Sequence, residues 1–211
     1  MVLPVSNGPR IMSESRLGLF GGSFDPVHNG HIAVASLARE FLGLSRVVFI
    51  PACIPPHKQR TVHAPAEHRL AMLERALAGK DEAFTIYRGE LERRGPSYSI
   101  DTIEELLHDY PGAEICFIVG SDNLTEIPTW HRYRDIVARV NLCVAHRPGY
   151  SGNPPPELDG ATITEMPSPE WGISSTMIRA LIAQGYSCDG LLPWGVRGYV
   201  EEHGLYGARR H

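Results

Sequence analysis

Short apolar runs alternate with longer amphipathic segments along most of the chain, beginning at Arg16. The runs are rich in β-branched and aromatic residues and predict strands at residues 17–20, 46–50, 84–87, 115–119 and 141–145, with a shorter one at 162–166. Two of them, RVVFI and ICFIV, are almost continuously apolar, which is typical of strands that are buried on both faces. The pattern indicates a sheet whose central strands are covered on either side.

Apolar positions spaced three and four residues apart predict helices between these strands. The predicted helices span residues 31–42, 65–78, 99–110, 132–139, 175–184 and 194–202. Pro65 opens one of them, Ser97 and Ser99 are candidate caps for the next, and Pro111 with Gly112 ends it. We therefore expect an α/β fold, a Rossmann-like open parallel sheet of about five or six strands with helices on both faces. Ligands in such sheets bind beyond the carboxyl ends of the strands.

The length of 211 residues fits a single domain, which we expect to span residues 16–211. Residues 1–15 have no periodicity and contain two prolines, an asparagine and a glycine, so they are interpreted as a mobile N-terminal tail, with Met12 as an alternative start. Residues 149–160 are rich in glycine and proline and predict a surface loop.

The composition of the chain argues against several classes of protein. A net charge of −4 argues against a nucleic-acid partner, although a local basic cleft for a small anion remains possible. The four cysteines form no CxxC pair, which favours reduced thiols: Cys53, Cys116, Cys143 and Cys188. No apolar run approaches the roughly 20 residues that cross a bilayer, and the first residues lack the features of a signal peptide. We expect a cytoplasmic protein with no membrane partner.

The first predicted strand runs into GGSFDPVHNGHI at residues 21–32, and a helix follows at once. Gly21 and Gly22 let the backbone approach a ligand closely, and the helix N-terminus offers N–H groups to a phosphate. His28 and His31 are three residues apart and can face the same anion. Taken alone, a glycine turn with two solvated histidines is the simpler interpretation. Neither a Walker A loop nor a GxGxxG spacing is present, and no further ligand completes a zinc site.

This segment resembles the G-(S/T)-F-D-P-x-H-x-G-H motif of the HxGH nucleotidyltransferase superfamily, and ISSTMIR at residues 173–179 resembles its second motif. The resemblance implies a nucleotidyltransferase fold in which His28, His31 and Arg179 stabilise the charge that builds as pyrophosphate leaves ATP. By position it also implies the ATP-binding residues Gly21, Gly22, Ser23, Phe24, Gly120, Asp122, Ile173, Ser174, Ser175 and Thr176. Without the resemblance, ISSTMIR is a helix cap beside a solvated arginine, and VGSDN at residues 119–123 is a plain turn.

Three further segments resemble the nicotinate mononucleotide adenylyltransferase branch of that superfamily: PPHK at residues 55–58, RRGPSYSIDT at 93–102, and the Trp130 region followed by HRPG at 146–149. The similarity then covers nearly all of residues 17–206. It implies that Lys58 and Arg147 meet substrate phosphate, and that Ser99 and Trp130 hold the pyridine carboxylate. Ser99 stands where threonine is common and keeps the hydroxyl. From the residues alone, Ser99 as a helix cap, Trp130 as a packing residue and Arg147 as a loop charge stay open.

The implied activity is transfer of AMP from ATP to nicotinate mononucleotide, which gives nicotinate adenine dinucleotide and pyrophosphate in NAD biosynthesis. Mg²⁺ would arrive with the ATP phosphates rather than at a metal site of the protein, because that ion keeps most of its water. A non-catalytic nucleotide-binding protein is one alternative. An activating enzyme like the aminoacyl-tRNA synthetases is another, but the tRNA-binding extension and KMSKS-like loop are missing. The sequence does not indicate the oligomeric state. The remaining histidines are expected on the solvated surface: His63, His68, His108, His131, His203 and His211.

Overall fold

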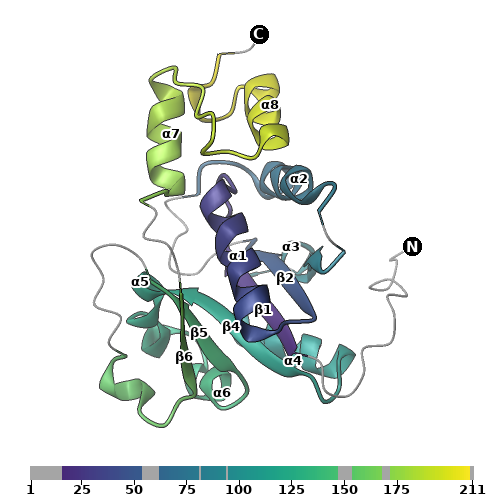
Figure 1. Cartoon of the computed structure of the whole chain (residues 1–211), viewed down its shortest axis with the longest axis vertical. Coiled ribbons are helices and arrows are strands. Elements are labelled where there is room, and N and C mark those ends of the chain that lie inside the picture. Colours follow the sequence, from purple (N-terminus) through teal and green to yellow (C-terminus); the bar gives the residue numbers. More distant parts are fainter. Residues whose placement is uncertain are drawn as a thin grey trace.

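The computed structural model describes residues 16–53, 62–80, 82–93, 95–146, 154–167 and 172–209. The predicted tail at residues 1–15 lies outside these ranges. Within them the chain forms a six-stranded sheet (Figure 1). Its strands are β1 Arg16–Gly22, β2 Arg46–Pro51, β3 Phe84–Ile86, β4 Glu114–Gly120, β5 Asn141–Ala145 and β6 Ile163–Met166.

The strand order is β3-β2-β1-β4-β5-β6, and every neighbouring pair is parallel. The chain moves outward from β1 to β3 and then returns to place β4 on the other side of β1. A parallel sheet opens a crevice at such a reversal, beyond the carboxyl ends of the strands on either side of it. The reversal therefore puts the ends of β1, β2 and β4 around one position.

Six helices with more than one turn accompany the sheet: α1 Asn29–Leu42, α2 Ala66–Leu77, α4 Ser99–Asp109, α6 Tyr133–Val137, α7 Ser175–Ala183 and α8 Trp194–His203. Two single turns, α3 Gly89–Glu92 and α5 Ser121–Leu124, and the 3-10 turns η1 Ile127–Thr129, η2 Pro156–Leu158 and η3 Leu205–Gly207 complete the described elements. The predicted α/β fold is confirmed. The predicted helix at 132–139 is shorter in the structure, and the two single turns were not predicted.

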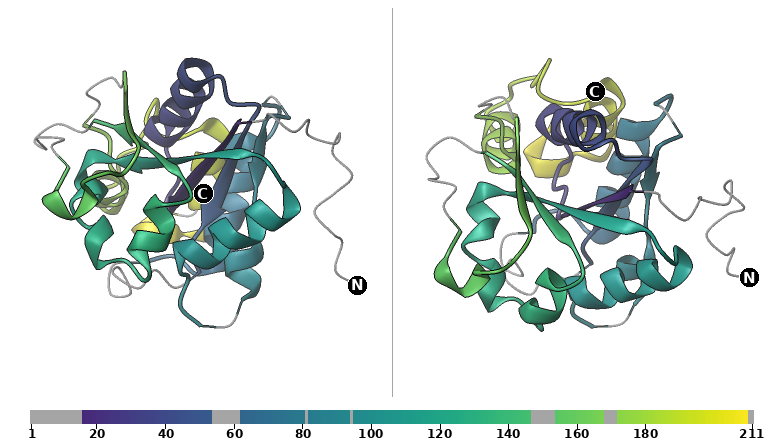
Figure 2. Two further views of the ribbon diagram at one scale, coloured as in Figure 1. Left: turned by 90° about the horizontal axis from the view of Figure 1, so that it is seen from below. Right: turned by 60° about the horizontal axis from the view of Figure 1, so that its bottom comes forward.

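Strand residues alternate between two hydrophobic cores. One core joins Phe20 and Phe49 to the buried faces of α1, α2, α7 and α8, whereas the other joins Leu19 and Val48 to α4 and α6. Figure 2 shows α1 on the opposite side of the sheet from α4 and α6. Both faces of the central strands are covered, which explains why RVVFI and ICFIV are apolar at every position except Arg46, the first and least buried residue of β2.

The C-terminal helices pack beyond the end of the sheet rather than along it. In Figure 1, α7 and α8 lie with α2 at the top of the molecule, and α8 packs against α2. All four cysteines lie in described residues and none is in a disulfide. No helix of the described ranges is long and apolar enough to span a membrane.

Candidate functional site

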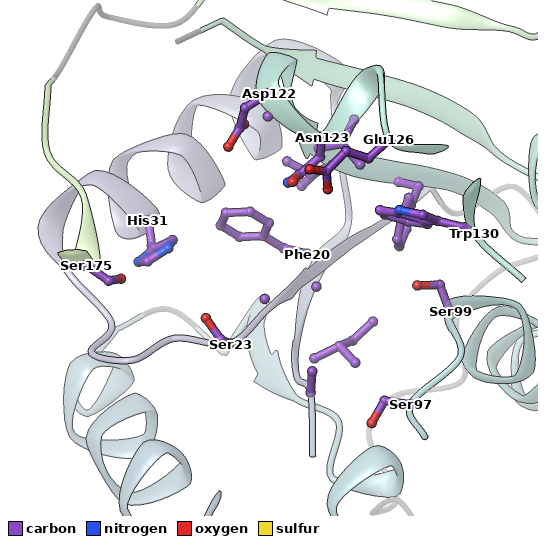
Figure 3. A pocket seen from close by; sticks show the side chains of 18 of the residues that line it. Phe20, Ser23, His31, Ser97, Ser99, Asp122, Asn123, Glu126, Trp130 and Ser175 are labelled. Carbon is purple, nitrogen blue, oxygen red and sulfur yellow. The ribbon is translucent and has the colours of Figure 1, made fainter. Parts of the chain in front are cut away.

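A cavity of about 480 Å³ opens at the carboxyl ends of β1, β2 and β4, where the strand order reverses. Its walls also come from the first turns of α1, α4 and α7. Figure 3 shows the two ends of this cleft separated by Phe20. One end, called the phosphate end below, holds Ser23, His31 and Ser175; the other, called the acceptor end, holds Ser97, Ser99 and Trp130.

Two histidines cap α1 reciprocally at the phosphate end. The Nδ1 atom of His28 accepts the backbone N–H of His31 at 3.3 Å, and Nδ1 of His31 accepts the N–H of His28 at 3.2 Å. This is a capping box built from imidazoles in place of hydroxyl and carboxylate groups. The rings stack with their centroids 3.6 Å apart. Because each Nδ1 is an acceptor, the proton of each neutral ring lies on Nε2, which is then a hydrogen-bond donor.

A buried arginine holds the loops behind the cleft. The Arg69 side chain is 1% exposed, and its guanidinium donates to the carbonyls of Ser23, Ala52 and Cys53 at 2.7–3.1 Å and to that of Ala64 at 3.2 Å. Burial lowers the pKa of Arg69, and the charge of nearby Asp25 opposes that shift. The loops that follow β1 and β2 are therefore tied to one another through α2.

Asp25 joins the loop after β1 to two distant segments. Its carboxylate is buried and accepts the backbone N–H of His63 at 2.7 Å and that of Ala64 at 3.1 Å. The hydroxyl of Tyr206 donates to the same carboxylate at 2.7 Å. A buried carboxylate is stable only when its oxygens are hydrogen-bonded. These three donors come from a loop 38 residues away and from the C-terminal turn 181 residues away.

The first turn of α7 docks on the same loop. Ser174 caps the helix, and the Ser175 hydroxyl donates to the carbonyl of Pro26 at 3.0 Å. The Nη1 atom of Arg179 donates to the main-chain oxygen of Asp25 at 2.7 Å and lies 4.0 Å from its carboxylate. Two helix N-termini and a guanidinium thus converge on the phosphate end, an arrangement suited to a polyphosphate.

The acceptor end has a buried carboxyl in its wall. Glu90 on α3 is 5% exposed and accepts the hydroxyl of Thr102 at 2.9 Å. Burial raises the pKa of Glu90, and hydrogen bonds from the Thr102 and Ser97 side chains oppose the rise. The Ser97 oxygen also accepts the backbone N–H of Cys53 at 3.0 Å. This chain of bonds attaches the segment before α4 to the end of β2.

Ser97 and Ser99 do not cap α4, which corrects the sequence-based expectation. The N-cap residue is Tyr98, whose side chain makes no capping bond. The Ser97 hydroxyl oxygen instead accepts the backbone N–H of Cys53, and Ser99 faces the cleft (Figure 3). Trp130 also lines the cleft while its ring packs edge-on against Phe117, with centroids 6.0 Å apart, so the packing and lining interpretations are compatible.

Most of the predicted site residues line this one cleft: Gly21, Gly22, Ser23, His28, His31, Ser99, Gly120, Asp122, Trp130, Ser174, Ser175, Thr176 and Arg179. Phe24 does not, because it is buried beneath the cleft with its ring edge-on to His31, at a centroid distance of 5.1 Å. Ile173 lines a smaller adjoining cavity with His28 and Gly30. Lys58 and Arg147 lie outside the described residues.

Sequence reasoning missed several residues of the site. Glu90, Asn123, Glu126 and His131 line the cleft, and the structural ties through Asp25 and Arg69 were not predicted. His131 was expected on the solvated surface; it is exposed, but it packs on Tyr98 at a centroid distance of 4.4 Å. Because His131 is adjacent in sequence to Trp130, a predicted site residue, its place in the cleft could have been predicted.

Two of the histidines expected on the solvated surface are only partly solvated. His68 and His203 are half-buried and pack around Tyr199, with ring centroids 5.7 and 4.0 Å from it. Across the described residues, no group of three or more His, Cys, Asp and Glu side chains is arranged to hold a metal ion.

Comparison with known proteins places the fold and the sequence in one family. Residues 19–181 match the cytidylyltransferase-like family. A probable nicotinate-nucleotide adenylyltransferase of Bordetella pertussis is 44% identical over 202 residues, covering 92% of this chain and 100% of that protein. One from Thermus thermophilus is 44% identical over 193 residues, covering 90% of this chain and 99% of that protein.

Among solved structures, the nicotinic acid mononucleotide adenylyltransferase of Plasmodium falciparum complexed with NaAD shares the fold, with a TM-score of 0.75 at 15% identity. The superposition covers 93% of this chain and 100% of that one. Because two relatives are 44% identical over 90% or more of its length, this chain belongs to the nicotinate-nucleotide adenylyltransferase family within the cytidylyltransferase-like nucleotidyltransferases.

Proposed function

We propose that this chain transfers AMP from ATP to nicotinate mononucleotide, giving nicotinate adenine dinucleotide and pyrophosphate. Family membership supports this reaction. The main structural support in this chain is the following observation. A single cleft joins the stacked histidines and Arg179 at its phosphate end to the hydroxyl and aromatic groups at its acceptor end. A bisubstrate site for a triphosphate and a pyridine mononucleotide requires both ends within one cleft.

At the phosphate end, we assign His28, His31 and Arg179 to catalysis. As α-phosphorus is attacked, negative charge builds on the departing pyrophosphate, and fixed donors that meet this charge stabilise the transition state. The reciprocal capping bonds hold each imidazole in one orientation with Nε2 as donor. Arg179 is oriented by its bond to the main chain of Asp25, so little reorganisation is needed when the charge appears.

ATP is assigned to the backbone and hydroxyl groups around these three residues. The segment Gly21–Gly22–Ser23 runs along the floor, and Ser174, Ser175 and Thr176 present a helix N-terminus. Gly120 is the last residue of β4 and Asp122 lies on α5 directly after it, and both would meet the adenosine. Phe24 supports His31 from beneath, and Ile173 borders the adjoining cavity, so their contribution would be to shape the ATP site.

At the acceptor end, we assign Ser99 and Trp130 to the pyridine ring and its carboxylate. Lys58 and Arg147 stay predictions for the substrate phosphate. The cleft is not lined by donors alone, because Glu90 and Glu126 also face it. The raised pKa of Glu90 favours its neutral form, and Glu126 is exposed to solvent, which screens its charge. Acid selectivity would therefore depend on the Ser99 hydroxyl and on backbone N–H groups near Trp130 other than those of Thr129 and Trp130, which already donate to the carbonyls of Glu126 and Ile127.

The reaction needs no activated side chain. The phosphate monoester of the acceptor is already a nucleophile near neutral pH, so catalysis consists of aligning it with the α-phosphorus and stabilising the leaving group. We place Mg²⁺ on the ATP phosphates, where it would add positive charge, because this ion binds phosphate oxygens readily and keeps much of its water.

A product assay separates this proposal from the two alternatives. With ATP, Mg²⁺ and nicotinate mononucleotide, the chain should form nicotinate adenine dinucleotide and pyrophosphate in equal amounts. A non-catalytic binding protein would form neither. An activating enzyme of the synthetase kind would exchange labelled pyrophosphate into ATP with an amino acid and without the mononucleotide, and that outcome would refute the proposal.

A further inference from the structure

Tyr206 is a C-terminal residue in an unusual conformation with a specific buried partner. It lies in η3, after the last helix, and its φ of 57° is in the left-handed region that non-glycine residues seldom adopt. Its hydroxyl donates to Oδ1 of Asp25 at 2.7 Å, across 181 residues of sequence. Burial raises the pKa of the Tyr206 phenol, as does the charge of Asp25, so the hydroxyl keeps its proton and remains a donor.

The partner of this hydroxyl controls the phosphate end of the cleft. Within the described part of the chain, the other donor to Oδ1 of Asp25 is the Ala64 N–H, at 3.1 Å. Loss of the Tyr206 hydroxyl therefore leaves a buried carboxylate oxygen with one hydrogen bond fewer. The main-chain oxygen of the same residue accepts Nη1 of Arg179. A shift of Asp25 therefore moves the guanidinium that the proposed reaction uses.

Tyr206 itself does not reach the substrate cleft. It lines a separate open cavity along α7, which shares Thr176 and Arg179 with the cleft. Arg179 thus forms the partition between the two cavities, held by Asp25 on the loop and by the Thr176 hydroxyl at 3.2 Å on its own helix. Any effect of Tyr206 on the reaction must therefore act through Arg179.

We propose that Tyr206 is a positioning residue for the phosphate end: its hydroxyl fixes the carboxylate of Asp25, and Asp25 in turn orients Arg179 toward the leaving pyrophosphate. The proposal rests on the proposed function above. It gives the C-terminal turn a part in the reaction, although no atom of Tyr206 lines the substrate cleft.

The test compares Tyr206→Phe with Tyr199→Phe. Tyr199 is a matched control because its hydroxyl is also hydrogen-bonded, to Nδ1 of His68 at 2.8 Å, in the same C-terminal region but away from the cleft. We expect Tyr206→Phe to lower kcat about tenfold and to change KM for the mononucleotide less than about twofold, because small misplacements of an aligned group are costly in rate. Tyr199→Phe should leave both constants near those of the unaltered chain. Thermal melts of both variants establish that each is folded at the assay temperature.

A double variant tests whether Tyr206 acts through Arg179. In an Arg179→Lys background, the added Tyr206→Phe change should lower kcat by less than about twofold, since the group it positions is already gone. Equal kcat for Tyr206→Phe and Tyr199→Phe would overturn the proposal, and so would an undiminished effect in the Arg179→Lys background.

ATP binding supplies a readout that needs no turnover. By titration calorimetry, we expect Tyr206→Phe to weaken ATP binding about threefold, because Arg179 also meets the bound phosphates through charge-assisted bonds. Tyr199→Phe should not weaken it. A chain that binds ATP with this pattern but forms no dinucleotide would refute the proposed function and leave the positioning role standing, whereas equal ATP affinities would overturn the positioning role.

Discussion

At the scale of single residues, the stacked histidines show how one side chain can serve structure and chemistry together. His31 satisfies the N–H of His28 through Nδ1, and the same ring presents Nε2 toward the cleft. A serine or glutamate would cap the helix as well but would supply no second donor on a rigid ring. Two adjacent imidazoles are therefore better explained by a ligand than by the needs of the helix.

Replacing His31 with alanine should lower kcat by about 10² or more while ATP affinity changes little, since the charge that His31 meets develops mainly in the transition state. Steady-state kinetics and ATP titration give the two quantities. The change also removes a cap, so His31→Gln is the companion variant: glutamine is an ordinary partner in a capping box. If His31→Gln recovers thermal stability and also full kcat, the role assigned to the imidazole is wrong.

Ser99 is the residue on which the acceptor assignment depends most. Its hydroxyl faces the cleft and caps no helix, so loss of the hydroxyl should affect the substrate rather than α4. Ser99→Ala should raise KM for nicotinate mononucleotide roughly tenfold, the loss expected for one hydrogen bond to a charged group. Ser36→Ala, which alters an exposed serine bonded only to its own helix, is the control. An unchanged KM in Ser99→Ala would remove this residue from the acceptor site.

At the scale of elements, the long helices and buried strands could be predicted because each carries its own periodicity. α3 and α5 have four residues each, too few for a pattern to emerge, and they contribute Glu90, Asp122 and Asn123 to the cleft. The bonds to Asp25 span 38, 154 and 181 residues, and no local pattern encodes them. The motif residues at strand ends were predictable by family resemblance, whereas the groups that hold them were not.

Glu90 gives the short helix α3 a pH-dependent contribution to stability. Its folded pKa is raised above 4.5 by burial, so the folded state holds this proton more tightly than the unfolded chain does. The contribution is fully present below pH 4.5 and is lost as the pH rises through the raised value. Urea unfolding at a series of pH values should show the unaltered chain losing stability relative to Glu90→Gln across this window.

Glutamine at position 90 keeps an oxygen that can accept the Thr102 hydroxyl, so the comparison isolates the charge. Glu92→Gln is the matched control, because Glu92 lies on the same turn and is exposed. Stability curves for the unaltered chain and Glu90→Gln that stay parallel over the whole pH range would contradict this reading of the buried carboxyl.

At the scale of the whole molecule, the site is formed by segments from the N-terminal and C-terminal parts of the fold that pack against each other. The loop after β1 and the first turn of α7 are about 150 residues apart, yet the Ser175 hydroxyl and Pro26 are hydrogen-bonded. α7 and α8 also complete the core beneath α1 and α2. We therefore propose that the described residues from Arg16 onward act as a single domain, in which the C-terminal helices form one wall of the cleft and cannot be removed without losing it.

The most direct test is turnover of the unaltered chain with ATP, Mg²⁺ and either nicotinate or nicotinamide mononucleotide, followed by chromatography of the products. A site whose donors face a carboxylate leaves the N–H₂ of an amide opposite other donors, and such mismatches can separate two substrates by orders of magnitude. We expect nicotinate adenine dinucleotide from the acid, with kcat/KM at least about 10² higher than for the amide. Equal turnover of the two mononucleotides would contradict the acceptor assignment, and no dinucleotide from either would contradict the adenylyltransferase function itself.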